Sequence, residues 1–207
     1  MKKEGLIAIF LAAGKSSRMG VNKLSLPLST YSVGSSALKT ALLSSLDQVL
    51  VITKEEDSLN WMNPSFFHPP YSSRWTHIVC DDAEKGQAHS LQRGFQAALS
   101  MDPRGIMVLL ADQPYLSEVT IEKVIRAYVQ SATPVDFVAA RYDGISSPPV
   151  IFSPRVLPSL MTLKGDIGAR KLLQKLKGRF VDCSNPRDFL DIDTREDYEM
   201  ATGGETG

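Results

Sequence analysis

Apolar runs of strand length alternate along this chain with segments that have a helical pattern. The run Leu6–Ala12 is apolar at every position, which is typical of a strand buried on both faces. Parallel strands need crossover helices, and these helices cover both faces of their sheet. The alternation therefore predicts an α/β fold with a mostly parallel central sheet.

The same pattern gives the expected elements. Ser117 and Thr194 are the expected N-caps of two helices. The expected strands are Leu6–Ala12, Gln48–Thr53, Thr76–Cys80, Ile106–Ala111, Asp136–Arg141, Val150–Phe152 and Arg179–Asp182. The expected helices are Ser35–Ser45, Gln87–Met101, Ser117–Ser131, Pro154–Leu160, Ile167–Lys175 and Thr194–Ala201.

Length and composition indicate one domain. The chain has 207 residues, of which 43% are hydrophobic and 22% are charged. At about 150 residues per domain, we expect a single domain over residues 1–201 and a flexible, Gly-rich tail over 202–207. The segment Asn60–Ser73 has no clean period, but we expect it to belong to the same domain rather than to form a linker.

Charge and cysteine use limit the partners. Lys and Arg number 23, as do Asp and Glu, so no global field attracts nucleic acid or an anionic membrane surface. Two cysteines outside any CxxC pattern fit a reducing cytoplasm.

The longest apolar run, Leu6–Ala13, is far shorter than the roughly 20 residues of a membrane helix. Lys2 and Lys3 before this run leave a signal peptide as the alternative to a buried first strand.

Glycines and cations follow directly on the first expected strand. In an open parallel sheet, ligands bind beyond the carboxyl ends of the strands, and the first turn commonly supplies backbone N–H groups to an anion. Arg18 can form two parallel hydrogen bonds with phosphate oxygens, and Lys23 adds a point charge. The segment therefore predicts a triphosphate site, with a solvated basic loop as the alternative. It is not a Walker A loop, because Ile9 stands where that motif needs its first glycine.

Four motifs occur in order over almost the whole chain: Leu11–Lys23 (LAAGxxxRMGxxK), Gly86–Leu91 (GQAHSL), Leu110–Pro114 (LADQP) and Asp191–Tyr198 (DIDTxxDY). They resemble the motifs of the MobA-like NTP transferase family, and the first looks like its MocA type. The resemblance implies a three-layer Rossmann-like nucleotidyltransferase fold. It also implies a molybdenum cofactor cytidylyltransferase, which joins CMP from CTP to the phosphate of molybdopterin and releases pyrophosphate.

Some members of the family are accessory proteins of purine catabolism. The resemblance therefore implies that the matured cofactor serves a xanthine-dehydrogenase-type enzyme, with transient contact to this molybdoenzyme or its chaperone. Two other functions stay open: a sugar-1-phosphate nucleotidyltransferase, and a noncatalytic carrier of the cofactor or nucleotide.

The family pattern places the nucleotide beside the first motif and at the start of the helix expected from Gln87, where ordinary helix capping is the alternative. Ala13 stands where guanylyl-transferring relatives resemble glycine, which favours CTP over GTP. The expected nucleotide-binding residues are Leu11, Ala12, Ala13, Gly14, Arg18, Lys23, Asp81, Gly86, Gln87, Ser90 and Asp112.

Asp112 directly follows the expected strand Ile106–Ala111, at the edge of the sheet where the first strand also ends. Mg²⁺ typically binds one or two carboxylates together with substrate phosphates, so we expect Asp112 to hold Mg²⁺ unless it only forms a turn. Asp193 is the second expected ligand, although it also begins a helix-capping pattern. The expected catalytic residues are Arg18, Lys23 and Asp112, because in-line transfer at phosphorus depends on positioning and charge neutralisation.

The acceptor side is expected later in the chain. Gly165–Arg170 resembles a family motif, and within it Gly165, Asp166 and Arg170 are expected to bind the molybdopterin, the alternative being a loop that begins a helix. Ser147–Pro149 departs from the family pattern, in which Gly-His-Pro or Gly-Val-Pro is expected before the next strand.

Overall fold

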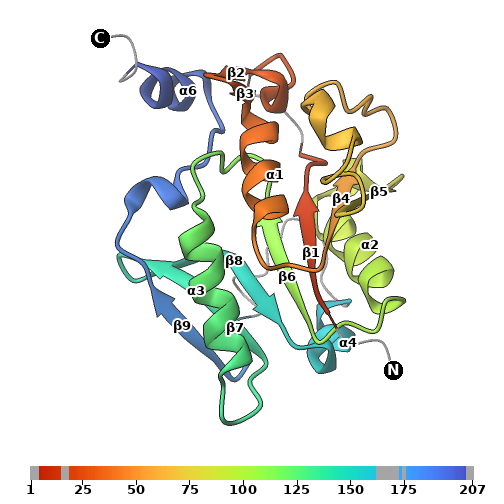
Figure 1. Cartoon of the computed structure of the whole chain (residues 1–207), viewed down its shortest axis with the longest axis vertical. Coiled ribbons are helices and arrows are strands. Elements are labelled where there is room, and N and C mark those ends of the chain that lie inside the picture. The colour runs from red at the N-terminus through yellow and green to blue at the C-terminus, as the bar shows by residue number, and fades with distance from the viewer. Residues whose placement is uncertain (1–4, 15–18, 162–172, 174–175, 204–207) are drawn as a thin grey trace.

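Seven strands form one sheet in the order β5-β4-β1-β6-β8-β7-β9 (Figure 1). The structure is a computed structural model that describes residues 5–14, 19–161, 173 and 176–203. All strand pairs are parallel except those of β8, which runs antiparallel to both β6 and β7. The strands are β1 (Leu6–Leu11), β4 (Gln48–Thr53), β5 (Trp75–Val79), β6 (Gly105–Leu110), β7 (Phe137–Tyr142), β8 (Ile145–Phe152) and β9 (Gly178–Asp182). The predicted mostly parallel sheet is confirmed.

Helices cover both faces of this sheet. Side chains of α1 and α3 pack with Ala8 and Phe10 of β1 in one core cluster, and side chains of α2 and α4 pack with Ile7 and Ile9 in the other. Alternate residues of β1 thus enter opposite cores, as the pleat of a strand requires. The three layers confirm the Rossmann-like α/β architecture. The helices are α1 (Val33–Leu43), α2 (Gln87–Leu99), α3 (Glu118–Val129), α4 (Leu157–Leu160) and α6 (Arg195–Thr202).

The helix ends follow their capping residues. Ser117 accepts a hydrogen bond from the N–H of Thr120, and Thr194 forms a reciprocal capping box with Asp197, so both predicted N-caps are present. The helix predicted from Ser35 begins two residues earlier, because Ser32 is its N-cap. α6 includes Thr202, which the sequence pattern assigned to the tail. The predicted helix Ile167–Lys175 lies outside the described residues except for Leu173.

The strand predicted over Val150–Phe152 is wrong in its start, because β8 begins at Ile145. Its first part pairs with β7, and the register shifts between Ala139 and Ala140. Pro148 and Pro149 lie at this irregularity, where a residue without an N–H group interrupts the ladder least. These prolines hide the strand from a sequence pattern.

The segment Asn60–Ser73 completes the core over α1. Trp61 and Phe66 are buried, and the hydroxyl of Ser35 donates to the Trp61 carbonyl at 2.7 Å. A Cβ on Gly34 would come within 2.6 Å of the Trp61 ring, so this contact requires glycine. The predicted helix Pro154–Leu160 is present as a 3₁₀ turn, Pro154–Val156, followed by α4. The sequence pattern did not predict the short hairpin of β2 (Pro27–Leu28) and β3 (Tyr31–Ser32), nor the 3₁₀ helices at Lys23–Ser25, Pro64–Phe67, Ala83–Lys85 and Pro186–Phe189.

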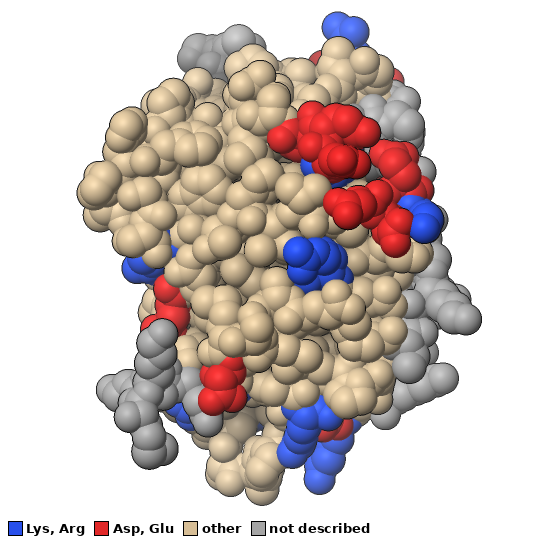
Figure 2. Space-filling model, turned by 90° about the vertical axis from the view of Figure 1, so that its right-hand side faces the viewer, with Lys and Arg blue, Asp and Glu red and all other residues tan. Residues whose placement is uncertain are grey.

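Charged side chains of both signs lie on the face shown in Figure 2. In Figure 2, the largest group of Asp and Glu side chains forms a patch at the upper right of this face and others lie apart from it, while Lys and Arg side chains form no continuous basic surface. Within the part of the chain that the structure describes, no helix is long and apolar enough to cross a membrane.

Candidate active site

The central strands β1 and β6 end side by side and leave two chemically important segments at one edge of the sheet. Strand-like bonding continues just past both strands: the Ala12 N–H donates to the Ile52 carbonyl at 2.8 Å, and the Ala111 N–H donates to the Leu11 carbonyl at 3.1 Å. Asp112 therefore directly follows the last residue of this segment that bonds to β1. This is the edge where ligands bind in open α/β folds.

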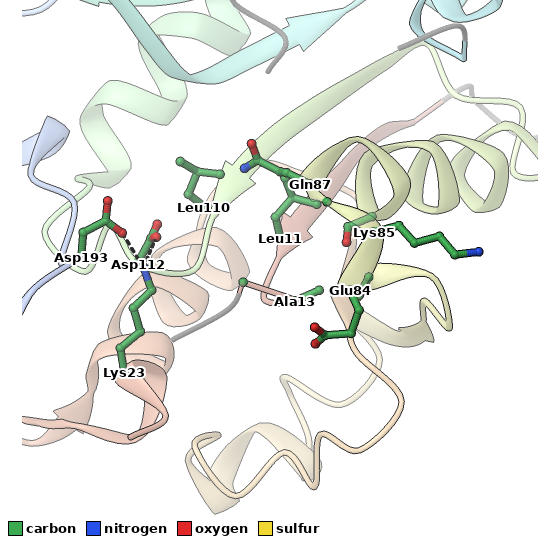
Figure 3. Close-up of a pocket in the computed structure, with 13 residues that line it drawn as sticks. Leu11, Ala13, Lys23, Glu84, Lys85, Gln87, Leu110, Asp112 and Asp193 are labelled. Atoms are coloured by element: carbon green, nitrogen blue, oxygen red, sulfur yellow. Dashed lines mark hydrogen bonds and ion pairs between the residues drawn. The ribbon is translucent and has the colours of Figure 1, made fainter. Parts of the chain in front are cut away.

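Lys23 joins two acidic residues at this edge. Its Nζ lies 2.6 Å from Asp112 Oδ2 and 2.8 Å from Asp193 Oδ1 (Figure 3). Lys23 begins a 3₁₀ helix whose N-cap, Asn22, accepts a hydrogen bond from the Leu24 N–H. The Ile192 N–H donates to the Asp112 carbonyl at 2.9 Å, and this bond brings Asp193 to the end of β6.

The electrostatics of this cluster favour a charged lysine. Burial would lower the pKa of Lys23, but the charge of Asp112 and hydrogen bonds to both carboxylates raise the pKa above its ordinary value. Lys23 is thus a permanent cation at neutral pH.

Asp191 adds a third carboxylate. The residue is exposed as a whole, yet its carboxyl accepts a 2.8 Å hydrogen bond from the Nε2 of buried Gln113. Loss of solvation around this carboxyl, together with the negative charge of Asp112, raises the pKa of Asp191 to about 6, although the Gln113 bond opposes this. The carboxyl is less exposed than the residue as a whole, because it contacts the fully buried Gln113.

The donor set fits a hard divalent cation that arrives with phosphates. Asp112 Oδ1 is buried and has no hydrogen-bond partner among the described residues, so it is available as a ligand. No group of three or more His, Cys, Asp or Glu side chains in the described ranges could hold a metal ion. Asp112 and Asp193 could therefore hold Mg²⁺ only together with oxygens from a substrate or water, which is how Mg²⁺ usually binds.

A cavity of about 570 Å³ opens beside this cluster, a size typical of sites for small molecules. Figure 3 shows Lys23 and its two carboxylate partners on one side, Leu11 and Ala13 in the middle, and Glu84 and Lys85 opposite. The opposite wall comes from the 3₁₀ helix Ala83–Lys85 and the start of α2. Gly86, the N-cap of α2, belongs to this wall. Its φ of +122° is a conformation that favours glycine.

A second, smaller cavity of about 140 Å³ continues from the first. Leu11, Gln87 and Leu110 line both cavities. Its lining is mainly apolar and includes Ser147 and Pro148, from the stretch where this chain departs from the family pattern. A ligand that spans both cavities would thus meet charges at one end and apolar groups at the other.

Comparisons with known proteins agree with this geometry. The family model of the MobA-like NTP transferase domain matches residues 8–180. The chain belongs to this family. It is 44% identical over 204 residues to the purine catabolism protein PucB of Bacillus subtilis (strain 168), and the match covers 97% of each chain.

Solved structures share the fold. A nucleotidyl transferase from Methanothermobacter superposes with a TM-score of 0.74 at 22% identity, over 97% of each chain. The manganese complex of Rv0371C from Mycobacterium tuberculosis H37Rv gives a TM-score of 0.67 at 22% identity, over 95% of this chain and 97% of that chain. The chain is therefore a nucleotidyltransferase by family, and it has the fold of these structures.

The structure brings most of the predicted site residues of this MobA-like transferase to one cavity. Ala12 is buried and lines only a small neighbouring cavity, while Asp81 is exposed and lines no described cavity. Arg18, Gly165, Asp166 and Arg170 lie outside the described residues. The predicted residues that line the main cavity are Leu11, Ala13, Gly14, Lys23, Gly86, Gln87, Ser90, Asp112 and Asp193.

Some residues of the site were not predicted. Leu110 and the 3₁₀ helix Ala83–Lys85 line the main cavity, and Asp191 belongs to the acidic cluster. The signal for Asp191 was its place in the fourth motif, where only Asp193 was singled out.

A Cβ on Gly14 would meet no atom within 4 Å, so the space beside Gly14 is open toward the cavity.

Proposed function

We propose that this MobA-like transferase joins CMP from CTP to the phosphate of molybdopterin and releases pyrophosphate. An oxygen of the molybdopterin phosphate attacks the α-phosphorus of CTP and forms the new P–O bond. The bond from the α-phosphorus to the bridging oxygen breaks, and its electron pair leaves with pyrophosphate. A phosphate nucleophile is already largely ionised near neutral pH, because its second pKa is near 6, so the step needs no dedicated base.

The observation that supports this proposal is the cluster of Lys23, Asp112 and Asp193 beside a cavity of nucleotide size. Two anionic substrates must approach one another, so catalysis depends on positioning and on neutralising charge. Lys23, together with Arg18, would hold the triphosphate, and the backbone of Ala13 and Gly14 would contact its oxygens.

Mg²⁺ is the proposed cofactor. Asp112 and Asp193 would hold it, and Asp112 Oδ1, which is buried and has no hydrogen-bond partner among the described residues, fits this role. The manganese complex of Rv0371C supports a divalent cation in a protein of this fold. When bound, the cation would neutralise charge on the triphosphate.

The nucleotide and its acceptor are assigned to different parts of the site. At the start of α2, Gly86, Gln87 and Ser90 are proposed to contact the base and ribose, and Ala13 favours CTP over GTP. The smaller cavity, with Pro148 in its wall, suits an apolar or planar part of the acceptor. The purine catabolism protein PucB supports a recipient enzyme of the xanthine dehydrogenase type.

The test is direct. Purified protein is incubated with Mg²⁺, molybdopterin and each of the four nucleoside triphosphates in turn, and mass spectrometry detects the dinucleotide. We expect a molybdopterin–cytidine dinucleotide and one pyrophosphate per product. Sugar 1-phosphates in place of molybdopterin test the alternative acceptor. Binding of CTP and molybdopterin without any pyrophosphate would instead indicate a carrier.

A further inference from the structure

The side-chain nitrogen of Lys23 lies between the two carboxylates that are proposed to hold the divalent cation. Nζ is 2.6 Å from Asp112 Oδ2 and 2.8 Å from Asp193 Oδ1. Only 10% of the Lys23 side chain is exposed, so the ammonium group is inside the site and not at its rim. The three residues come from distant parts of the chain, and the fold brings their charged groups together.

An ammonium ion and a divalent cation cannot share this space. Mg²⁺ binds carboxylate oxygens at 2.0–2.1 Å, so a cation held through Asp112 Oδ2 and Asp193 Oδ1 would compete with Nζ for the same space. While Lys23 is in place, Asp112 offers a cation only its second oxygen, Oδ1. Two positive charges at such separation also repel strongly when solvent is partly excluded. Lys23 must therefore move away before one cation can bind Asp112 and Asp193 through these two oxygens.

A triphosphate offers the partners that would allow this movement. Its oxygens are strong acceptors for an ammonium group and could replace both carboxylates around Nζ. Lys23 lines the main cavity, so it need not cross the protein to reach a ligand there.

We propose that Lys23 occupies the divalent-cation position in the ligand-free protein and excludes the cation until a nucleoside triphosphate arrives. This inference rests on the proposed function and gives Lys23 two successive partners, first the carboxylates and then the triphosphate. Cation and nucleotide binding are consequently coupled, and each increases the affinity for the other.

The experiment measures Mn²⁺ binding without turnover. Electron paramagnetic resonance of free Mn²⁺ gives the dissociation constant for wild type, Lys23→Met, the double variant Lys23→Met/Asp112→Asn, and Lys85→Met. Each protein is measured alone and with a non-hydrolysable CTP analogue. Lys85 is the matched control, because it lines the same cavity but pairs with exposed Asp82. Thermal melting shows which variants are folded.

We expect wild type and Lys85→Met to bind Mn²⁺ at least about tenfold more weakly than Lys23→Met when no nucleotide is present. The double variant should lose this gain, because Asp112 supplies the ligand. Equal Mn²⁺ affinity of wild type and Lys23→Met without nucleotide overturns the inference, even if both proteins turn over CTP.

Wild type alone also provides a test, in case Lys23→Met does not fold. Saturable, tight Mn²⁺ binding by nucleotide-free wild type, unchanged when the CTP analogue is added, overturns the inference. If wild type binds no Mn²⁺ even with the analogue, the proposed function itself fails, and this outcome is distinct from the previous one.

Discussion

At the scale of single residues, one ammonium group lies among three carboxylates. Lys23 pairs with Asp112 and Asp193, and Asp191 adds negative charge nearby. Among the described residues, this cluster thus places more carboxylates than ammonium groups at the end of β6. Such an arrangement suits the divalent cation that is proposed to bind here with a nucleotide.

Replacing Asp112 by asparagine should reduce turnover by about 10²-fold or more, because the amide keeps the size but removes the charge that holds the metal. The variant loses an ion pair with Lys23 but also loses repulsion with Asp191. Its melting temperature should therefore stay within about 4 °C of wild type, the shift that about 1 kcal/mol produces at this size. Pyrophosphate release at saturating Mg²⁺ is measured beside Asp182→Asn, which breaks only an exposed pair with Arg141. Normal turnover of Asp112→Asn would remove Asp112 from the metal site.

Asp191→Asn should change the pH dependence of stability. The pKa of Asp191 is raised to about 6 in the folded protein, from 3.8 as the ordinary value. The folded state then binds more protons than the unfolded state between these values, so this group's favourable contribution is present below pH 4 and lost as the pH rises through 6. The melting temperature of Asp191→Asn relative to wild type should rise between pH 4.5 and pH 8 in metal-free buffer. A difference that stays constant over this range would contradict the raised pKa.

At the scale of elements, α6 links two parts of the site. Its N-cap Thr194 follows Asp193 directly, and the Asp197 carboxylate accepts hydrogen bonds from the backbone N–H groups of both. Further along the helix, the Tyr198 hydroxyl donates to the Pro27 carbonyl at 2.5 Å, near the 3₁₀ helix that begins with Lys23. The helix thus orients one carboxylate and contacts the segment of its cationic partner.

Thr194→Ala should destabilise the protein by about 1 kcal/mol, because it removes the side-chain acceptor from the N-terminus of α6. Urea unfolding gives this free energy. Thr202→Ala at the other end of the same helix is the matched control, and we expect it to cost less than about 0.5 kcal/mol, since it removes only a hydroxyl that donates to the Tyr198 carbonyl. Equal effects of the two variants would show that the capping box adds nothing to stability.

At the scale of the whole molecule, the sequence predicts the sheet well and the site in part. Buried runs such as Leu6–Leu11 are apolar throughout, so their strands are visible without any knowledge of their neighbours. Asp112 was predicted because it directly follows such a run. By contrast, the prolines hide the start of β8, and the position of Asp193 against Lys23 depends on a bond between the Ile192 and Asp112 backbones that no local pattern encodes.

Ligand binding should stabilise the whole fold, because the main cavity is built from separate segments at the ends of β1 and β6, at the start of α2 and before α6. A ligand that binds only the folded state raises its stability by about 2.7 kcal/mol at 100 times the dissociation constant, and so raises the melting temperature. The nucleotide preference gives the test: with Mg²⁺ present, we expect CTP to raise the melting temperature of the protein more than GTP does at equal concentration. The Cβ of Ala13 would fill space beside the base in the proposed site, but one methyl group discriminates by only about 1–3 kcal/mol. Ala13→Gly should therefore narrow the difference between the two nucleotides without abolishing stabilisation by CTP. Equal shifts for CTP and GTP in wild type would show that Ala13 does not select the base.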